Sequence, residues 1–182
     1  NVASGSSVVG GGQYNDATGN SSTVAGGYTN VASGSQAAVG GGWTNTASGL
    51  QSTVAGGDGN EATGEESTVA GGEGNDATGK KSVITGGGFN DASGTSSFVG
   101  GGQYNNARGN YSSVLGGGGS SLSDSNSELG TYSTVAGGHS NVAKGNSSFA
   151  AGRNAKAEYD GSFVWNGSSS SFSDSDSLQF LI

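Results

Sequence analysis

An asparagine recurs every fifteen residues along most of this chain, and a glycine follows each one by four positions. The first interval is one residue shorter, and a six-residue insertion, Ser120–Ser125, delays the ninth asparagine. The ten units read N-x-A-[S/T]-G-x-x-S-x-V-x-G-G-x-x with few departures. A short, strict period is typical of stacked repeats, in which each copy must fit the copies on either side of it.

Fifteen residues are too few for a helical hairpin, and the glycines leave segments of about four to six residues, the length of short β-strands. A chain that closes one coil per unit places equivalent strands about 4.8 Å apart. The sequence therefore predicts an all-β fold, a parallel β-solenoid or β-roll with about 15 residues per coil and about ten coils. We expect the glycines at corners with positive φ. We expect the asparagines at turns that tolerate the αL region, with side chains bonded to one another along the stack.

Alternation within each strand predicts which side chains face inward. Alanine in the first strand and valine or isoleucine in the second form two inward columns. The predicted core residues are Ala17, Val24, Ala32, Val39, Ala47, Val54, Ala62, Val69, Ala77, Ile84, Ala92, Val99, Ala107 and Val114.

The opposite face of the second strand carries a column of mostly small residues, beside a column of Thr, Val and Phe. Small residues allow backbones to approach closely, and one coil buries little apolar surface of its own. We therefore expect this face to pack against identical chains around a symmetry axis. The predicted interface residues are Ala25, Ala55, Ala70, Leu115 and Ala136.

Composition excludes several classes of protein. The net charge is −8, with only six scattered Lys and Arg residues, so a nucleic-acid partner is not expected. The chain has no Cys, which rules out disulfides and thiolate metal sites, and no apolar run long enough to cross a bilayer. Few large apolar residues would suit a disordered chain, but disorder does not predict strict spacing. Glu65 and Glu66 precede Lys80 and Lys81 by one unit, so stacking predicts two ion pairs between adjacent coils.

The segment "NDATGNSSTVAGG" (Asn15–Gly27) resembles the head repeats of YadA-like trimeric autotransporter adhesins. The resemblance covers roughly residues 1–152 and implies a left-handed parallel β-roll, a homotrimer and an extracellular, cell-surface location. The unit here is 15 residues rather than about 14, and the second core position is Val where the family often has Ala. We expect residues 153–182 to form a degenerate last coil and a segment that caps the stack or links subunits.

The inventory of side chains argues against an enzyme. His139 is the only histidine, it follows a Gly pair, and we expect it to be solvated. No organic cofactor is indicated. Oxygen-bearing side chains at alternate positions of a loop suit Ca²⁺, although on an exposed strand the same pattern is commonly just solvated. The candidate Ca²⁺ ligands are Asp124, Asn126 and Glu128 in and after the insertion, and Asp174 and Asp176 in the tail.

Variable positions carry the remaining candidate sites. Tyr28 and Trp43 share one loop column, and Tyr14, Phe89 and Tyr104 share the next. Exposed aromatics stack on sugars or seal contacts with a neighbouring chain. Sequons make glycosylation an expectation at four asparagines. These are Asn20, Asn110, Asn146 and Asn166.

The sequence therefore predicts an extracellular structural protein, a trimeric β-roll head or shaft that mediates attachment to a protein or glycan on a surface. The main alternative is a subunit of a self-polymerising filament, joined end to end through residues 1–9 and 178–182. A more remote alternative is an ice-binding solenoid. That alternative rests on a column of Ser and Thr that Arg108 and Lys144 interrupt.

Overall fold

The fold was analysed in a computed structural model of the chain, which describes residues 1–176 and 178–181. Ser177 and Ile182, in the predicted linking segment, lie outside the described residues. The chain divides into two compact units, Asn1–Phe89 and Asn90–Ile182. Within the described residues, no helix is long and apolar enough to cross a membrane.

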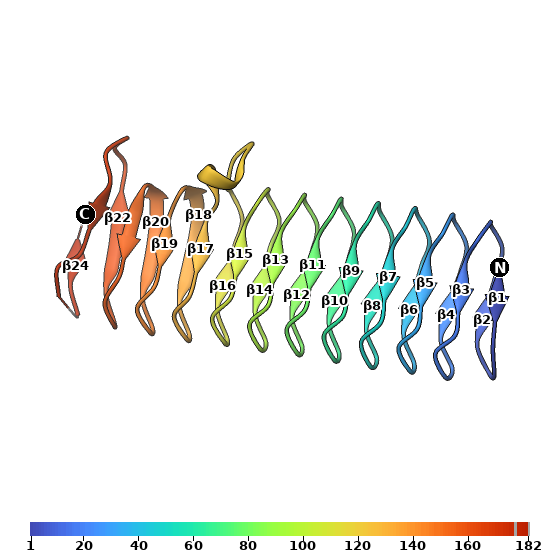
Figure 1. The fold of residues 1–182 in the computed structure, drawn as a ribbon. Helices are drawn as coiled ribbons and strands as arrows, with labels where there is room; N and C mark the ends of the chain where they lie inside the picture. Colours follow the sequence, from blue (N-terminus) through green and yellow to red (C-terminus); the bar gives the residue numbers. More distant parts are fainter. Residues whose placement is uncertain (177, 182) are drawn as a thin grey trace. The chain divides into compact units, whose positions relative to one another are not determined.

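The first unit is a stack of coils in which each coil contributes one short strand to each of two parallel sheets (Figure 1). Equivalent residues of adjacent coils pair, as Asp16 with Val31 and Ala17 with Ala32. The first sheet holds β1 (Val2–Ala3), β3 (Asp16–Ala17), β5 (Val31–Ala32), β7 (Thr46–Ala47), β9 (Glu61–Ala62) and β11 (Asp76–Ala77). The second sheet holds β2 (Val8–Val9), β4 (Thr23–Val24), β6 (Ala38–Val39), β8 (Thr53–Val54), β10 (Thr68–Val69) and β12 (Val83–Ile84).

The second unit repeats this architecture and adds a 3₁₀ turn, η1 (Leu122–Asp124), in the insertion, which stands out from the coils in Figure 1. Its first-sheet strands are β13 (Asp91–Ala92), β15 (Asn106–Ala107), β17 (Ser127–Glu128), β19 (Val142–Ala143), β21 (Ala155–Ala157) and β23 (Phe172–Ser173). Its second-sheet strands are β14 (Phe98–Val99), β16 (Ser113–Val114), β18 (Thr134–His139), β20 (Phe149–Arg153), β22 (Phe163–Asn166) and β24 (Phe180–Leu181). The parallel solenoid is confirmed, with about twelve coils where the sequence predicted about ten. The two additional coils arise because β21 to β24 pair onto the stack after the asparagine period has ended.

The interior of each unit is narrow and consists of the two inward columns. All fourteen predicted core residues are buried, as are Val135, Ala143 and Ala150 where the repeat continues past the insertion. Each coil thus supplies only one small and one medium-sized apolar side chain to the core, together with a buried serine at most positions.

Corner geometry differs from the expectation in two ways. The column asparagines from Asn15 to Asn141 are buried and do not adopt positive φ. The αL positions are instead the residues directly before these asparagines, except Ser125 before Asn126, and directly before the buried serines, such as Thr44 and Gln51. Gly49, four residues after Asn45, also lacks positive φ, but a Cβ there would lie 2.0 Å from the Gly64 carbonyl oxygen of the next coil. Close stacking, rather than φ, therefore requires glycine at this corner.

Candidate interaction surfaces

The buried asparagines form a ladder that fixes the loop before each of them. Asn45 Nδ2 donates to the Gly41 carbonyl in its own coil at 2.9 Å and to the Gly57 carbonyl in the next at 2.8 Å. The Oδ1 atom of Asn45 accepts from the backbone N and the Nδ2 of Asn60 at 3.0 and 3.1 Å. Because every polar atom of the side chain has a partner, the Gly-Gly loop is held rigidly, and variable side chains after it are displayed at fixed spacing.

Three aromatic side chains of the first unit line up on these loops, and we call Tyr14, Tyr28 and Trp43 the aromatic stripe. Their exposed fractions are 65%, 38% and 56%. The ring centroids of Tyr14 and Tyr28 lie 5.4 Å apart, and those of Tyr28 and Trp43 lie 4.8 Å apart. The spacing follows the stacking of the coils, so the stripe runs across three successive coils.

The outer face of the second sheet presents the predicted interface residues to solvent. Ala25, Ala55, Ala70, Leu115 and Ala136 are all exposed in the single chain. In the second unit a neighbouring column carries aromatic rings that stack coil upon coil. Phe149 and Phe163 have centroids 4.5 Å apart, and Phe163 and Phe180 have centroids 4.7 Å apart. This face therefore carries mostly small side chains in the first unit and large aromatic side chains in the second.

Both predicted ion pairs between adjacent coils are confirmed. Lys80 Nζ lies 2.9 Å from Glu65 Oε1, and Lys81 Nζ lies 3.6 Å from Glu66 Oε2. The hydrogen bond and charge of Glu65 raise the pKa of Lys80 above its ordinary value. Both pairs lie on the surface, so water screens them and they mark the register of the coils more than they stabilise it.

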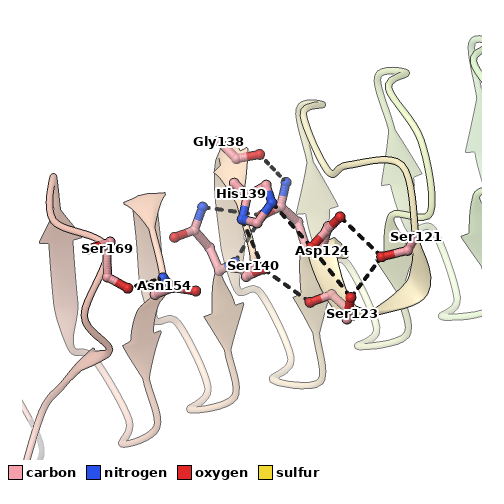
Figure 2. A network of polar contacts seen from close by, with 10 residues as sticks. Ser121, Ser123, Asp124, Gly138, His139, Ser140, Asn154 and Ser169 are labelled. Carbon is pink, nitrogen blue, oxygen red and sulfur yellow. Dashed lines mark hydrogen bonds and ion pairs between the residues drawn. The ribbon is translucent and has the colours of Figure 1, made fainter.

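The insertion is tied to the following coil by a polar network around His139 (Figure 2). His139 Nε2 lies 3.3 Å from Asp124 Oδ1, and the hydroxyl of Ser140 lies 3.0 Å from His139 Nδ1. Ser121 Oγ donates to Asp124 Oδ2 at 3.0 Å, and Ser140 Oγ donates to the Ser123 carbonyl at 3.1 Å. His139, expected to be merely solvated, is half-buried and braces the insertion against the next coil.

The candidate Ca²⁺ ligands around the insertion do not come together. Asp124 faces His139, Asn126 belongs to the buried asparagine ladder, and Glu128 points into the core between Ala107 and Ala143. No cluster of three or more metal-ligating side chains exists among the described residues. Ca²⁺ binding by the chain stays a prediction.

Glu128 occupies the inward position that alanine fills in the other nine repeat units, which was the only sequence signal for an unusual core residue. It is fully buried, its Oε1 accepts from the backbone N–H of Val135, and its Oε2 has no hydrogen-bond partner among the described residues. Burial raises the pKa of Glu128 to about 8, against the opposing effects of the Val135 N–H and the Ser112 hydroxyl. This shift favours the protonated, uncharged form of the carboxyl group at neutral pH.

In the tail, Asp174 is buried and accepts from the backbone N–H groups of Glu158 and Tyr159 at 2.8 and 3.0 Å. It closes a corner of the preceding coil, a role that its sequence context did not indicate. Asp176 is exposed, and its backbone carbonyl accepts from the hydroxyl of Ser162 at 3.2 Å.

The four sequon asparagines differ in accessibility. Asn20, Asn110 and Asn146 are exposed, whereas Asn166 is buried and its Nδ2 donates to the Ser170 carbonyl at 2.7 Å. The first three asparagines are the accessible candidates for a glycan, and modification of any of them stays a prediction.

Comparison with known families bears directly on the repeat. A family model described as the ubiquitous surface protein adhesin repeat matches residues 22–34 and 52–64. Each matched segment starts at a buried serine, passes through a second-sheet strand and the Gly-Gly loop, and ends at the glycine four residues after a ladder asparagine. A search of curated proteins found no match.

Together with the parallel solenoid, this match shows that the chain carries YadA-like head repeats, of the kind found in the trimeric autotransporter adhesins. These repeats are those of surface-exposed, adhesin-like fibre proteins, and they point to a structural rather than an enzymatic role.

Proposed function

We propose that this chain is an extracellular adhesive fibre protein that assembles as a homotrimer and attaches to surfaces through the side chains on its loops. The adhesin repeats support the general role. The trimer is supported by one structural observation, the exposed apolar outer face of the second sheet.

That face has the chemistry of a self-association surface. Ala25, Ala55 and Ala70 of the first unit leave room for the backbone of another chain to approach, and Leu115 of the second unit is 53% exposed. Exposed contiguous apolar surface is a common mark of interfaces between chains. Because the core of each coil is so thin, burial of this face between three chains would add substantial apolar surface to what each chain buries alone.

Attachment would then be left to the loops that remain outside the trimer. The buried asparagine ladder fixes their backbone, while the residues after each Gly-Gly pair vary from coil to coil. A rigid frame with variable side chains is a common arrangement in binding proteins.

The experiment that tests the proposal combines light scattering with adhesion. The purified chain is expected to have the mass of three chains, and beads coated with it are expected to adhere to cell surfaces more than beads coated with an unrelated acidic protein. Negative-stain microscopy distinguishes the filament alternative, because long uniform filaments in place of discrete particles would favour end-to-end polymerisation. A monomer that does not adhere would contradict the proposal.

A further inference from the structure

The aromatic stripe of the first unit has the features of a ligand-binding surface. We propose that Tyr14, Tyr28 and Trp43 bind a linear, uncharged, β-linked glycan that lies across the coils. The inference rests on the proposed adhesive function and names the chemical class of the ligand.

The rings stand on a backbone that is already ordered. Parallel bridges join Gln13 to Tyr28, Tyr28 to Trp43, and Trp43 to Asp58. The backbone N–H of Tyr28 donates to the Gly42 carbonyl at 2.9 Å, and that of Trp43 donates to the Gly57 carbonyl at 2.9 Å. A ligand that stacks on these rings would therefore not have to order the loops, and preorganisation of this kind favours binding.

The shape of the stripe fits a linear chain better than a compact ligand or a protein surface. At Tyr28 and Trp43 it is one ring wide, because a glycine precedes each of them and a threonine follows. The described residues contain no pocket, so a ligand must lie on the surface rather than within it. The ring planes differ by 83° between Tyr14 and Tyr28 and by 46° between Tyr28 and Trp43, so the three rings do not form one flat platform and each would contact a different sugar ring of the glycan.

Polar groups along the stripe suit the hydroxyl groups of sugars. In the bridged column Gln13 precedes Tyr28 and Asp58 follows Trp43, and the column continues to Glu73 and Gly88. The hydroxyl of Thr44 donates to Asp58 Oδ1 at 3.2 Å, which orients that carboxylate beside Trp43. Aromatic faces with neighbouring hydrogen-bonding groups match the apolar faces and polar rims of pyranose rings.

Self-association does not explain the stripe equally well. Its residues lie on the loops after the Gly-Gly pairs, whereas the proposed interface residues, such as Ala25 and Ala55, lie before those pairs, directly after the second-sheet strands β4 and β8. The rings also contact one another along the stack instead of leaving gaps for the side chains of a partner.

The test is calorimetric titration of the full chain with cellohexaose and with chitohexaose. The double variant Tyr28→Gln, Trp43→Gln places in this column a residue that already occurs there as Gln13 and Gln103. Tyr111→Gln is the matched control, because it removes a ring that is 51% exposed from a different loop, at a column where Gln36 and Gln51 occur.

Saturable binding of at least one hexasaccharide is expected, with about tenfold or greater weakening in the double variant and no change in the control. Binding of neither sugar, or equal binding by the double variant, would overturn the inference. Bead adhesion separates the two proposals. Adhesion that the double variant retains refutes the glycan site alone, whereas no adhesion by the unmodified chain refutes the adhesive function.

Discussion

Two nitrogens of Asn45 contact the same atom, Oδ1 of Asn30 in the preceding coil. The backbone N donates to it at 3.0 Å, and Nδ2, which also donates to the Gly41 and Gly57 carbonyls, shares one of its hydrogens with it at 3.2 Å. The same pair of bonds joins Asn60 to Asn45, so the side chains form a continuous ladder within the first unit. A shift of one coil by one residue would break its ladder bonds to the coils on both sides and bury unpaired amides. The ladder therefore fixes the register that places the variable loop residues in columns.

Replacement of Asn45 by Ala is expected to destabilise the first unit by more than about 2 kcal/mol, because several buried polar groups lose their partners at once. The Gly41 and Gly57 carbonyls and the backbone N–H of Asn60 all bond to this side chain. Chemical denaturation followed by circular dichroism measures the effect. Asn20→Ala, at an exposed position, is the control and should change stability by less than about 0.5 kcal/mol. Equal effects would show that the ladder does not stabilise the fold.

Substitutions at two glycines test whether close stacking of the coils, rather than backbone flexibility, requires glycine. A Cβ on Gly49 would lie 2.0 Å from the Gly64 carbonyl oxygen, whereas a Cβ on Gly56 would have its nearest neighbour, the Gly41 carbonyl oxygen, at 3.8 Å. Gly49→Ala is therefore expected to force adjacent coils apart and to lower the melting temperature sharply. Gly56→Ala should leave the melting temperature unchanged or slightly raised, since it lowers the entropy of the unfolded chain. A Gly49→Ala protein as stable as the Gly56→Ala protein would contradict the tight spacing of the coils.

Glu128 should make the stability of the second unit depend on pH. Its folded-state pKa of about 8 lies above the ordinary value of 4.5. Below pH 4.5 the carboxyl group is protonated in both the folded and the unfolded chain, so it does not make stability depend on pH. Between pH 4.5 and 8 the unfolded chain releases the proton while the folded chain keeps it, so the free energy of unfolding falls as the pH rises. Above pH 8 the carboxyl group is ionised in both states, and this loss of stability does not increase further. Among the described residues, the groups around the carboxyl are the side chains of Ala107, Ala143 and Ser112 and the backbone N–H of Val135, and none of them is charged.

Glu128→Ala, which restores the residue common at this position, is expected to remove most of this decline. Melting temperatures recorded at pH 5, 7 and 9 provide the measurement. The variant should resemble the unmodified chain at pH 5 and melt higher at pH 9. Glu73→Gln removes an exposed carboxylate and should keep the original profile. If the variant is less stable than the unmodified chain at pH 9, the buried carboxyl group does not destabilise the fold at that pH.

Much of the fold could be predicted because a stacked repeat shows its contacts in the sequence itself. The 15-residue period places Glu65 opposite Lys80, and the structure has that ion pair at 2.9 Å. Alternation likewise assigned residues such as Val54 to the interior, and they are fully buried there. In both cases the contact joins equivalent positions of adjacent copies, so periodicity alone identifies the partners.

Features that break the period could not be read in the same way. β22 and β24 pair onto the stack although no repeat asparagine precedes them. Asp174 accepts hydrogen bonds from the backbone at a corner, and no repeat spacing in the sequence predicts this. The residues with positive φ, such as Thr44 and Gln51, were hidden because many residue types occupy those columns. The contacts of His139 with Asp124 depend on the path of the insertion, which has no counterpart in the other units.

The proposed interface gives a variant that separates assembly from folding. Leu115→Lys places a charge on the outer face of the second sheet, at a side chain that is exposed in the single chain. We expect the protein to keep its β-rich circular dichroism spectrum but to dissociate into single chains, because a buried unpaired ammonium group would be costly in the assembly. Tyr132→Lys, at an exposed loop position, should leave the assembly intact. Dissociation by both variants, or by neither, would argue against this face.

The most direct test of the proposed fibre is the mass of the unmodified chain in solution, measured by light scattering over a range of concentrations. The proposed homotrimer predicts three times the mass of one chain, independent of dilution over a wide range. A single-chain mass at every concentration would contradict it.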